Sequence, residues 1–472
     1  MKPAHDETTD GALRPFRIDA RNLTLAVLCI GFLAVLVCNL PGHLSYDSVV
    51  QLHDGRTGQY HSWHPPIMAW VLGLGDAVLP GSALFVVMDA ALLFGALAAL
   101  TLAARRVSWA APVVALILAL SPLVLIYQGI VWKDVFFADC AAAGFICLSL
   151  ADRCDARKPR FGLIALSLLL FVLASLIRQN GLTAPLAGSA ALTWMTVRRE
   201  GWRALGRGLG FGALLLVCVA VLVTVAGKAL DTRRIDEPGA AAQFQALQEY
   251  DLIGAVAHDP AMDLRRLTGP GTGAPDLDKR VRFAAARFYT PERVDTLAKD
   301  PGLNEALAAA PKAVSAQWRY ILTHDFKAYA GHRWDVFYWT IATPKLERCL
   351  PVFIGQEGPP GLLRKLGMFD QVRPQDLALE AYAVDFYATP LYSHLAYALI
   401  AVVAAVLLLL SRRPGDAPMG FLLLGALAFT ASFLIISFAC DYRYLYALDV
   451  AAMVAVFHLA ISGFDIRRRR KP

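Results

Sequence analysis

One polar stretch between two apolar segments gathers residue types that can do acid–base chemistry. The segment Leu44–Trp70 carries two carboxylates, Asp47 and Asp54, a Gly-x-Tyr turn that ends at Tyr60, and the sequence His64-Pro-Pro. A positioned carboxylate can take the proton from an attacking hydroxyl group. Asp47 is therefore the first candidate for a general base, with Asp54 as a substitute. The alternative for Asp47 is a solvated loop charge.

The two prolines predict that a helix begins directly after His64, because proline suits the first helical turn. His64 could contact a substrate or hold a carboxylate, or simply precede the helix. Three loop histidines and the two carboxylates could bind a divalent cation, but loop histidines are often free, so the sequence leaves a metal site open. The histidines are His53, His61 and His64.

A second ionisable pair, Lys133-Asp134, stands where two apolar runs meet. Such a pair is costly to bury at a span boundary unless it has a partner or a function. Lys133 could contact a phosphate, and Asp134 could bind an acceptor or a metal. The alternative is a lysine that extends to the membrane interface beside its neighbour. Asp139 follows within the next span, where it should face the bundle or a cavity.

Two arginines are placed where the positive-inside rule disfavours them. Arg178 ends an apolar run in the sequence Arg-Gln-Asn-Gly, and Arg443 stands in Asp-Tyr-Arg-Tyr-Leu-Tyr with Tyr444 beside it. An arginine can bind a phosphate through two parallel hydrogen bonds. We therefore expect both arginines to bind phosphate, with Tyr444 in contact. The alternatives are a plain loop charge at Arg178 and an interfacial aromatic belt around Arg443.

The composition identifies a polytopic membrane protein. Of 472 residues, 57% are hydrophobic and 18% are charged, against about 25% charged in an average soluble protein. The net charge of +7 does not indicate nucleic acid, because Lys and Arg lie mostly in short loops and tails. Cys349 is the one cysteine between residues 230 and 385, so that segment cannot hold an internal disulfide.

We count ten apolar runs near the roughly 20 residues that cross a bilayer. They are Leu23–Leu40, Ser82–Ala104, Ala110–Tyr127, Val135–Leu150, Phe161–Ile177, Leu182–Val197, Leu209–Ala229, Leu391–Leu410, Gly420–Ala439 and Tyr444–Ile461. With ten spans, every basic cluster falls on one side, which predicts that both termini are cytoplasmic. All the candidate chemical residues then share the external face. Pro65–Leu79 is predicted as a juxtamembrane helix rather than a span, because it contains Asp76 and two glycines.

The external segment 230–385 should be helical, because apolar residues recur at helical spacing. The expected helices are Ala241–Val256, Asp278–Phe288, Asn304–His324 and Pro360–Phe369, with a loop at Gly269–Pro275. The aromatic patch Trp334, Phe337, Tyr338 and Trp339 favours packing against the membrane surface over a sugar platform. The predicted order is a cytoplasmic tail (1–22), a first membrane module of about seven spans (23–229) with a catalytic loop (41–80), the external domain (230–385), a module of three spans (386–463) and a basic tail (464–472).

The order of these motifs resembles that of GT-C fold glycosyltransferases. The pattern is similar to the protein O-mannosyltransferase and lipid A aminoarabinose transferase families: Asp47 after the first span, then Gly-x-Tyr, then His64-Pro-Pro, an acidic motif at Asp134 and an Arg-Tyr-Leu motif at Arg443. No glutamate follows Asp47, and Ala447 replaces a usual proline. The resemblance does not cover 230–385.

This resemblance implies an inverting transfer of a sugar from a polyprenyl-phosphate donor to an acceptor hydroxyl, with Asp47 as the base. The acceptor could be an envelope glycan, a lipid or a protein, and a divalent cation is an option that the resemblance leaves open. The composition is compatible with a bacterial inner membrane. A flippase or transporter of lipid-linked sugars is the second hypothesis. A transporter should have charges in mid-span and an internal repeat, whereas this sequence has few such charges and no evident repeat. A catalytically silent scaffold is the third.

Overall fold

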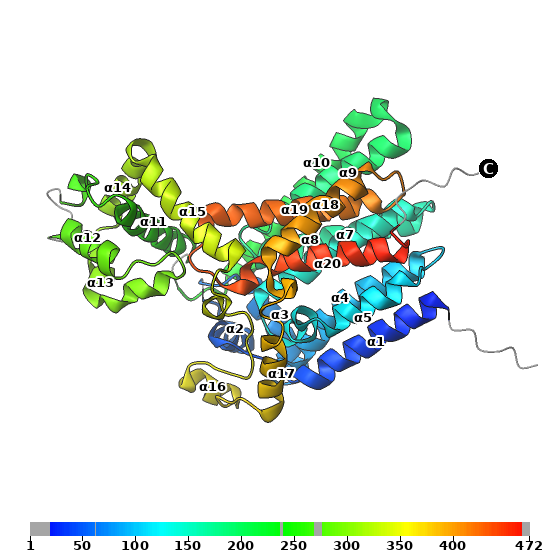
Figure 1. Cartoon of the computed structure of the whole chain (residues 1–472), viewed down its shortest axis with the longest axis horizontal. Helices are drawn as coiled ribbons and strands as arrows, with labels where there is room; N and C mark the ends of the chain where they lie inside the picture. The colour runs from blue at the N-terminus through cyan, green and yellow to red at the C-terminus, as the bar shows by residue number, and fades with distance from the viewer. Residues whose placement is uncertain (1–18, 62, 237–238, 269–275, 465–472) are drawn as a thin grey trace, which may run out of the picture.

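The protein is an all-helical bundle with a second group of helices at one end (Figure 1). The computed structural model describes residues 19–464 apart from 62, 237–238 and 269–275. Within these residues the β contacts are isolated bridges only, which confirms the predicted all-α class. Most of the predicted N-terminal tail, most of the basic C-terminal tail and the predicted loop Gly269–Pro275 lie outside the described residues.

Each of the ten predicted apolar runs falls on a helical segment. These are α1 (Ala20–Asn39), α4 (Ala83–Ala103), α5 (Ala110–Leu120) with α6 (Pro122–Leu125), α7 (Lys133–Arg153), α8 (Arg157–Ile177), α9 (Thr183–Glu200), α10 (Leu205–Asp231), α18 (His394–Leu410), α19 (Asp416–Ile436) and α20 (Tyr446–Ile461). Among the described residues, seven helices are long and apolar enough to span a membrane, and a pair bent by 65° after Leu120 would be an eighth. The total of ten spans stays a prediction.

The basic connections meet at one end of the bundle. Arg21 donates to the carbonyl of Arg105, and the amide of Ser108 donates to the carbonyl of Ile461. Arg199 forms an ion pair with Asp152 at the same end. The predicted grouping of the basic loops is thus reproduced, while the assignment of this end to the cytoplasm stays a prediction.

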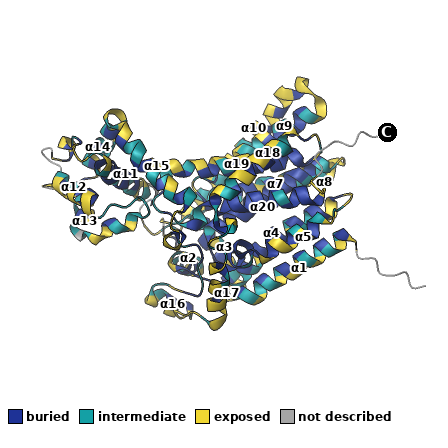
Figure 2. Cartoon of the chain, viewed as in Figure 1, coloured by how far each residue is buried: buried dark blue, intermediate teal, exposed yellow. Residues whose placement is uncertain are grey.

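Helices α7 and α20 form the centre of the bundle. Over their most apolar windows, 94% of residues are buried for α7 and 89% for the span that ends with α20, and both are dark along their length in Figure 2. A helix that is apolar all round must be covered on every side. The two central helices therefore need partners on all faces, and α4, α8, α9, α18 and α19 supply them.

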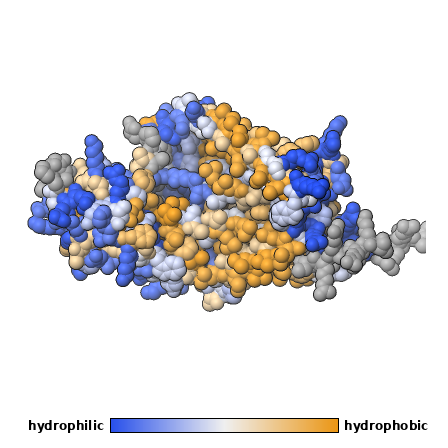
Figure 3. Space-filling view, turned by 90° about the horizontal axis from the view of Figure 1, so that it is seen from above, coloured by the Kyte–Doolittle hydropathy of each residue, from blue (hydrophilic) through white to orange (hydrophobic). Residues whose placement is uncertain are grey.

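The outer helices expose apolar side chains instead. Leu399, Val406 and Leu410 of α18 and Val217 and Val225 of α10 are among the exposed large hydrophobic residues. An orange region covers the middle of the surface in Figure 3, with hydrophilic ends on both sides. Such a belt suits a lipid environment rather than water.

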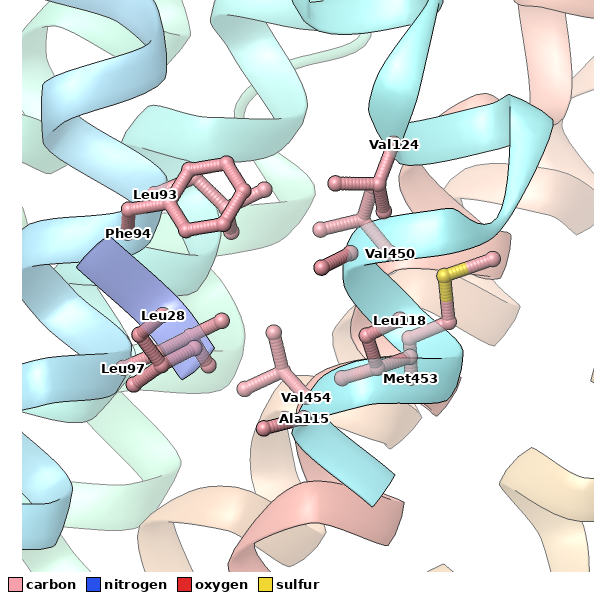
Figure 4. A pocket seen from close by; sticks show the side chains of 11 residues that line it. Leu28, Leu93, Phe94, Leu97, Ala115, Leu118, Val124, Val450, Met453 and Val454 are labelled. Carbon is pink, nitrogen blue, oxygen red and sulfur yellow. The ribbon is translucent and has the colours of Figure 1, made fainter. Parts of the chain in front are cut away.

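A pocket lies inside the bundle of apolar helices, between α1, α4, α5 and α20 (Figure 4). Its lining is apolar throughout, including Leu28, Phe94, Leu118 and Met453. A pocket without polar side chains cannot activate a hydroxyl or hold a phosphate. The polar chemistry must therefore lie elsewhere.

The segment between α1 and α4 folds into two packed helices, α2 (Tyr46–Thr57) and α3 (Pro66–Val78). Helix α3 begins at the proline pair and has 13 residues, as the predicted juxtamembrane helix requires. Asp76, whose charge argued against a full span, forms an ion pair with Arg56 of α2 at 2.6 Å. The two helices pack at Gly55 and Gly73, where the backbones approach closely.

We expect Gly55→Ala to lower the free energy of unfolding by about 1–3 kcal/mol, as overpacking of a tight contact does. A Cβ atom at Gly55 would lie 2.2 Å from the carbonyl oxygen of Ala69 and 2.7 Å from the amide nitrogen of Gly73. Backbone atoms on both sides cannot move aside cheaply. Thermal unfolding measures the effect. Gly162→Ala is the control, because its Cβ would meet nothing within 4 Å, and equal melting temperatures for the two variants would contradict the prediction.

The segment 230–385 is helical, but its helices differ from the predicted ones in three places. The predicted helix Asn304–His324 is two helices, because Pro311 begins a new one. Helices α15 and α17 were not predicted. The helices observed are α11 (Gly239–His258), α12 (Leu277–Arg287), α13 (Pro301–Ala309), α14 (Pro311–His324), α15 (Phe326–Ala342), α16 (Pro360–Leu366) and α17 (Pro374–Val384).

Residues of this segment belong to two different hydrophobic cores. Residues from Tyr250 to Val336 form a core of their own, whereas Leu346, Leu363 and Leu379 belong to the core of the membrane helices. The predicted boundaries 230–385 stay a prediction. In the aromatic patch of α15, Trp334 and Tyr338 are exposed and Phe337 packs against the membrane core, which leaves both readings of the patch open.

Candidate active site at the N-terminal ends of α7 and α20

The two central helices begin at the same end of the bundle, and this places their first residues side by side. Helix α7 starts at Lys133, after the extended residue Trp132. The short helix η7 (Tyr442–Leu445) leads directly into α20 and is preceded by Asp441. The positive ends of two helix dipoles therefore point toward one region. That region is where a negative group would be stabilised.

The segment between α1 and α4 is hydrogen-bonded to the residues before α7. The amide of His43 donates to the carbonyl of Gly129, and the amide of Val131 donates to the carbonyl of His43, each at 2.9 Å. The hydroxyl of Ser48 donates to the carbonyl of Val131 at 2.5 Å. Ser48 follows Asp47 directly, so these bonds fix Asp47 beside the start of α7.

Arg443 is the centre of the charged cluster. Its guanidinium lies 3.2 Å from a carboxylate oxygen of Asp47, 2.9 Å from Asp441 and 3.8 Å from Asp134. It also lies over the ring of Trp132, at 4.8 Å from the ring centroid. A planar guanidinium can meet several carboxylates at once. One side chain thus joins three acids from three separate parts of the chain.

His64 and Lys133 complete the cluster on the side of the first loop. The Nε2 atom of His64 lies 3.6 Å from Asp47, and its Nδ1 atom lies 3.5 Å from the Lys133 ammonium. If Nδ1 accepts from Lys133, Nε2 carries the ring proton and points it at Asp47. His64 thus lies between Lys133 and Asp47, and its role in holding that carboxylate stays a prediction.

Arg178 reaches the cluster from the end of α8. It forms a buried ion pair with Asp134, and its guanidinium lies 5.6 Å from the ring centroids of Phe433 and Tyr444. Burying an arginine is costly unless it is paired. The carboxylate and the aromatic rings meet that requirement, and they hold Arg178 beside the first turn of α7.

The pKa values of two acids in the cluster are shifted in opposite directions. Burial raises the pKa of Asp47, but the nearby His64 imidazole and the charge of Arg443 outweigh it, so the pKa falls below its usual range. Burial raises the pKa of Asp441 to about 6, with Asp134 and Asp47 adding to the effect against Arg443. Burial lowers the pKa of His64. At neutral pH, Asp47 is ionised and His64 is neutral.

Two predicted site residues lie outside the charged cluster. Asp54 is buried and accepts from the amide and the ring of His61, at 3.0 and 2.9 Å. Tyr60 is 2% exposed, and its backbone forms a bridge with Arg234 after α10. Both residues shape the turn that leads to His64. The cluster itself gathers the other predicted residues, namely Asp47, His64, Lys133, Asp134, Arg178, Arg443 and Tyr444.

A metal-ligand set is absent from the part of the chain that the structure describes, since no three His, Cys, Asp or Glu side chains there are placed to hold an ion. The three acids converge on Arg443 instead.

The sequence analysis did not select Asp441 or Trp132. Asp441 stands two residues before Arg443 in the same motif and binds it at 2.9 Å, so its place in the motif was a usable signal. Trp132 precedes Lys133, and its indole donates to Ser45 at 3.0 Å. Nothing in the sequence alone connects this tryptophan with an arginine more than 300 residues away.

A disulfide fastens the loop that carries Asp441. Cys349 is bonded to Cys440, which is 91 residues further along the chain. The sequence excluded a disulfide within 230–385, and the partner indeed lies outside that segment. The bond connects the segment after α15 to the residue directly before Asp441.

We expect the double variant Cys349→Ser, Cys440→Ser to lose about 2–4 kcal/mol of stability, because the bond closes a long loop in the unfolded chain. Thermal unfolding with and without reductant measures this. Reductant should lower the melting temperature of the wild type to that of the double variant and leave the double variant unchanged. Cys154→Ser, at the opposite end of α7, should behave as the wild type does. A wild type that is insensitive to reductant would contradict the prediction.

Comparisons with known proteins give a weak structural likeness. No protein-family model matches the chain, and no curated protein matches it. Among solved structures it is similar to the archaeal oligosaccharyltransferase AglB from Archaeoglobus fulgidus, determined in complex with an inhibitory peptide and a dolichol-phosphate. The identity is 13% and the TM-score is 0.38, over 93% of this chain and 50% of the archaeal chain. This chain therefore spans half the length of that protein, and a likeness at this TM-score carries no argument about function.

Proposed function

We propose that the protein is an integral membrane glycosyltransferase that moves a sugar from a polyprenyl-phosphate donor to an acceptor hydroxyl. The observation that carries this proposal is the convergence of Asp47, His64, Lys133, Arg178 and Arg443 at one end of an apolar helix bundle. The first two supply an acid–base pair, and the other three supply cations. A lipid-linked phosphate needs both within reach of the bilayer.

The cations suit the leaving group. When the bond from the sugar to phosphate breaks, the lipid phosphate gains negative charge, and preorganised donors stabilise that charge. Lys133 is the first residue of α7, so it adds its ammonium to the positive end of the helix dipole. Arg178 and Arg443 flank it, and both can bind two phosphate oxygens at once.

Asp47 suits the acceptor. Its side chain is 33% exposed, whereas those of Asp134 and Asp441 are 2% and 12% exposed. An incoming hydroxyl can therefore reach Asp47 first. In the proposed step the acceptor oxygen bonds to the anomeric carbon, the bond from that carbon to the phosphate oxygen breaks, and Asp47 takes the hydroxyl proton. Attack from the side opposite the phosphate inverts the anomeric carbon.

The low pKa of Asp47 in the free protein is compatible with this role. Arg443 contributes to the low pKa, and a bound phosphate would compete with Asp47 for the same guanidinium. The pKa of Asp47 should then rise toward the value of a useful base. Substrate binding would thus activate the carboxylate by removing a partner from it.

The disulfide supports placing this site on an external, oxidising face. Disulfides persist in the bacterial periplasm and in extracellular space, and they are rare in a reducing cytosol. Cys440 directly precedes Asp441, so the site and the bond share one compartment. We therefore place both termini in the cytoplasm and the site outside, in a bacterial inner membrane.

The test is a transfer assay on the purified protein in lipid nanodiscs, with a panel of polyprenyl-phosphate sugars and mixed envelope glycan, lipid and protein acceptors. Transfer from at least one donor supports the proposal. The variant Arg178→Gln should retain the fold and lose much of the transfer rate, whereas Arg56→Gln, an arginine paired with Asp76 away from the cluster, should retain the rate. Absence of transfer from every donor would favour the transporter or the scaffold.

A further inference from the structure

Two acids lie inside the apolar part of the bundle, apart from the charged cluster. Asp89 of α4 and Asp139 of α7 are 1% and 0% exposed. Each stands six residues after the first residue of its helix, 83 and 133, which is about 9 Å along the helix axis. The two helices pack together, so the acids share one depth. Asp139 faces the bundle, as the sequence predicted.

The surroundings of the pair are poor in hydrogen-bond donors. The carboxyl groups of Asp89 and Asp139 are close enough to interact directly. The amide of Gln128 donates to Asp139 at 2.8 Å. Four buried oxygen atoms have no hydrogen-bond partner among the described residues: both carboxylate oxygens of Asp89, Oδ1 of Asp139 and Oε1 of Gln128.

Neither acid has a cationic partner in the described part of the chain, where the ion pairs involve other carboxylates. The titratable groups that face the pair are the phenol of Tyr446 from α20 and the thiol of Cys140 from α7. Two neighbouring carboxylates repel each other, and an unpaired charge in an apolar interior is strongly disfavoured. Both acids therefore cannot be ionised together.

We infer that Asp89 and Asp139 form a proton-binding site within the membrane part of the protein, in which the two carboxyl groups share at least one proton. A proton between them provides the donor that the site lacks. A metal ion fits less well, because no group of three acidic, histidine or cysteine ligands exists among the described residues.

The proton site is connected to the helix that presents Arg443. The Gln128 amide also lies 3.4 Å from the hydroxyl of Tyr446, which donates to the carbonyl of Leu123 at 2.8 Å. Tyr446 is the first residue of α20 and follows η7 directly. Loss of the shared proton would drive α4 and α7 apart at this level. The residues of the charged cluster at the start of α7 and α20 would then be displaced from one another.

Infrared spectroscopy of the protein in nanodiscs at neutral pH tests this inference without any substrate, so its outcome is independent of the proposed transfer reaction. The wild type should have a protonated-carboxyl band that shifts in D₂O. The band should be reduced in Asp89→Asn, Asp139→Asn, which keeps the shape and neutrality of the pair. Asp76→Asn is the control: its carboxylate is ionised beside Arg56, so the band should remain. An unchanged band in the double variant would overturn the inference.

The single variants provide a second route if the double variant does not fold. Asp89→Asn and Asp139→Asn should each alter the same infrared band, since each removes one side of the shared proton. Their melting temperatures should not differ between sodium, potassium and choline buffers, and the same should hold for the wild type. A cation-specific stabilisation of the wild type that both variants lose would assign the site to a metal ion and overturn the inference.

Discussion

Asp47→Asn should lower the transfer rate by about 10²–10⁴-fold, the usual contribution of a positioned base. The side chains have the same shape, so the fold should survive. The substituted amide can still contact His64 and Arg443, whose partners include Asp134 and Asp441. The loss should therefore appear in kcat more than in KM, because the amide cannot accept the hydroxyl proton. Single-turnover transfer with a saturating donor measures it.

Asp54→Asn is the matched control for this experiment. Asp54 lies in the same helix, but it binds His61 and not the cluster. Its replacement should reduce stability and leave kcat within a few fold. A fully active Asp47→Asn protein would remove Asp47 from the role of base. Asp441 would then be the next candidate, because its pKa of about 6 is close to the value that favours proton transfer at neutral pH.

The sequence predicts the membrane part of the fold well because the signal there is strong and local. A run of about 20 apolar residues has few alternatives to a spanning helix. The juxtamembrane helix was predictable for a related reason: prolines begin it and Asp76 excludes a full span. The external helices were harder, since Pro311 both ends one helix and begins another. Helix α15 mixes aromatic and charged residues, and one apolar face is not evident.

The site was predictable as a set of residues but not as a geometry. Topology alone placed Asp47, Asp134, Arg178 and Arg443 on one face. It could not show that Arg443 contacts Asp47 across 396 residues of chain, nor that Asp54 turns away. The acid pair in α4 and α7 illustrates the limit: one Asp inside each of two apolar runs carries no sign that the two meet.

Arg443→Ala should abolish transfer and cost about 3–5 kcal/mol of stability, as removal of one partner from a buried charge cluster does. The side chain is 12% exposed, so little water can replace it. Asp47, Asp134 and Asp441 would remain close together without the guanidinium. Arg443→Lys should recover part of the stability and little of the activity, because an ammonium cannot meet three carboxylates in one plane.

The stability deficit of Arg443→Ala should also depend on pH with a defined sign. Burial and the neighbouring acids raise the pKa of Asp441 to about 6 even though Arg443 lowers it, so the alanine variant should raise that pKa further. An acid whose pKa is raised by folding favours the folded state at low pH, and this stability is lost as the pH rises through the folded pKa. The melting temperature of the variant should thus approach that of the wild type near about pH 5 and fall well below it near about pH 8. A deficit that stays constant across this range would mean that the three acids do not repel one another, and the central role of Arg443 in the cluster would be wrong.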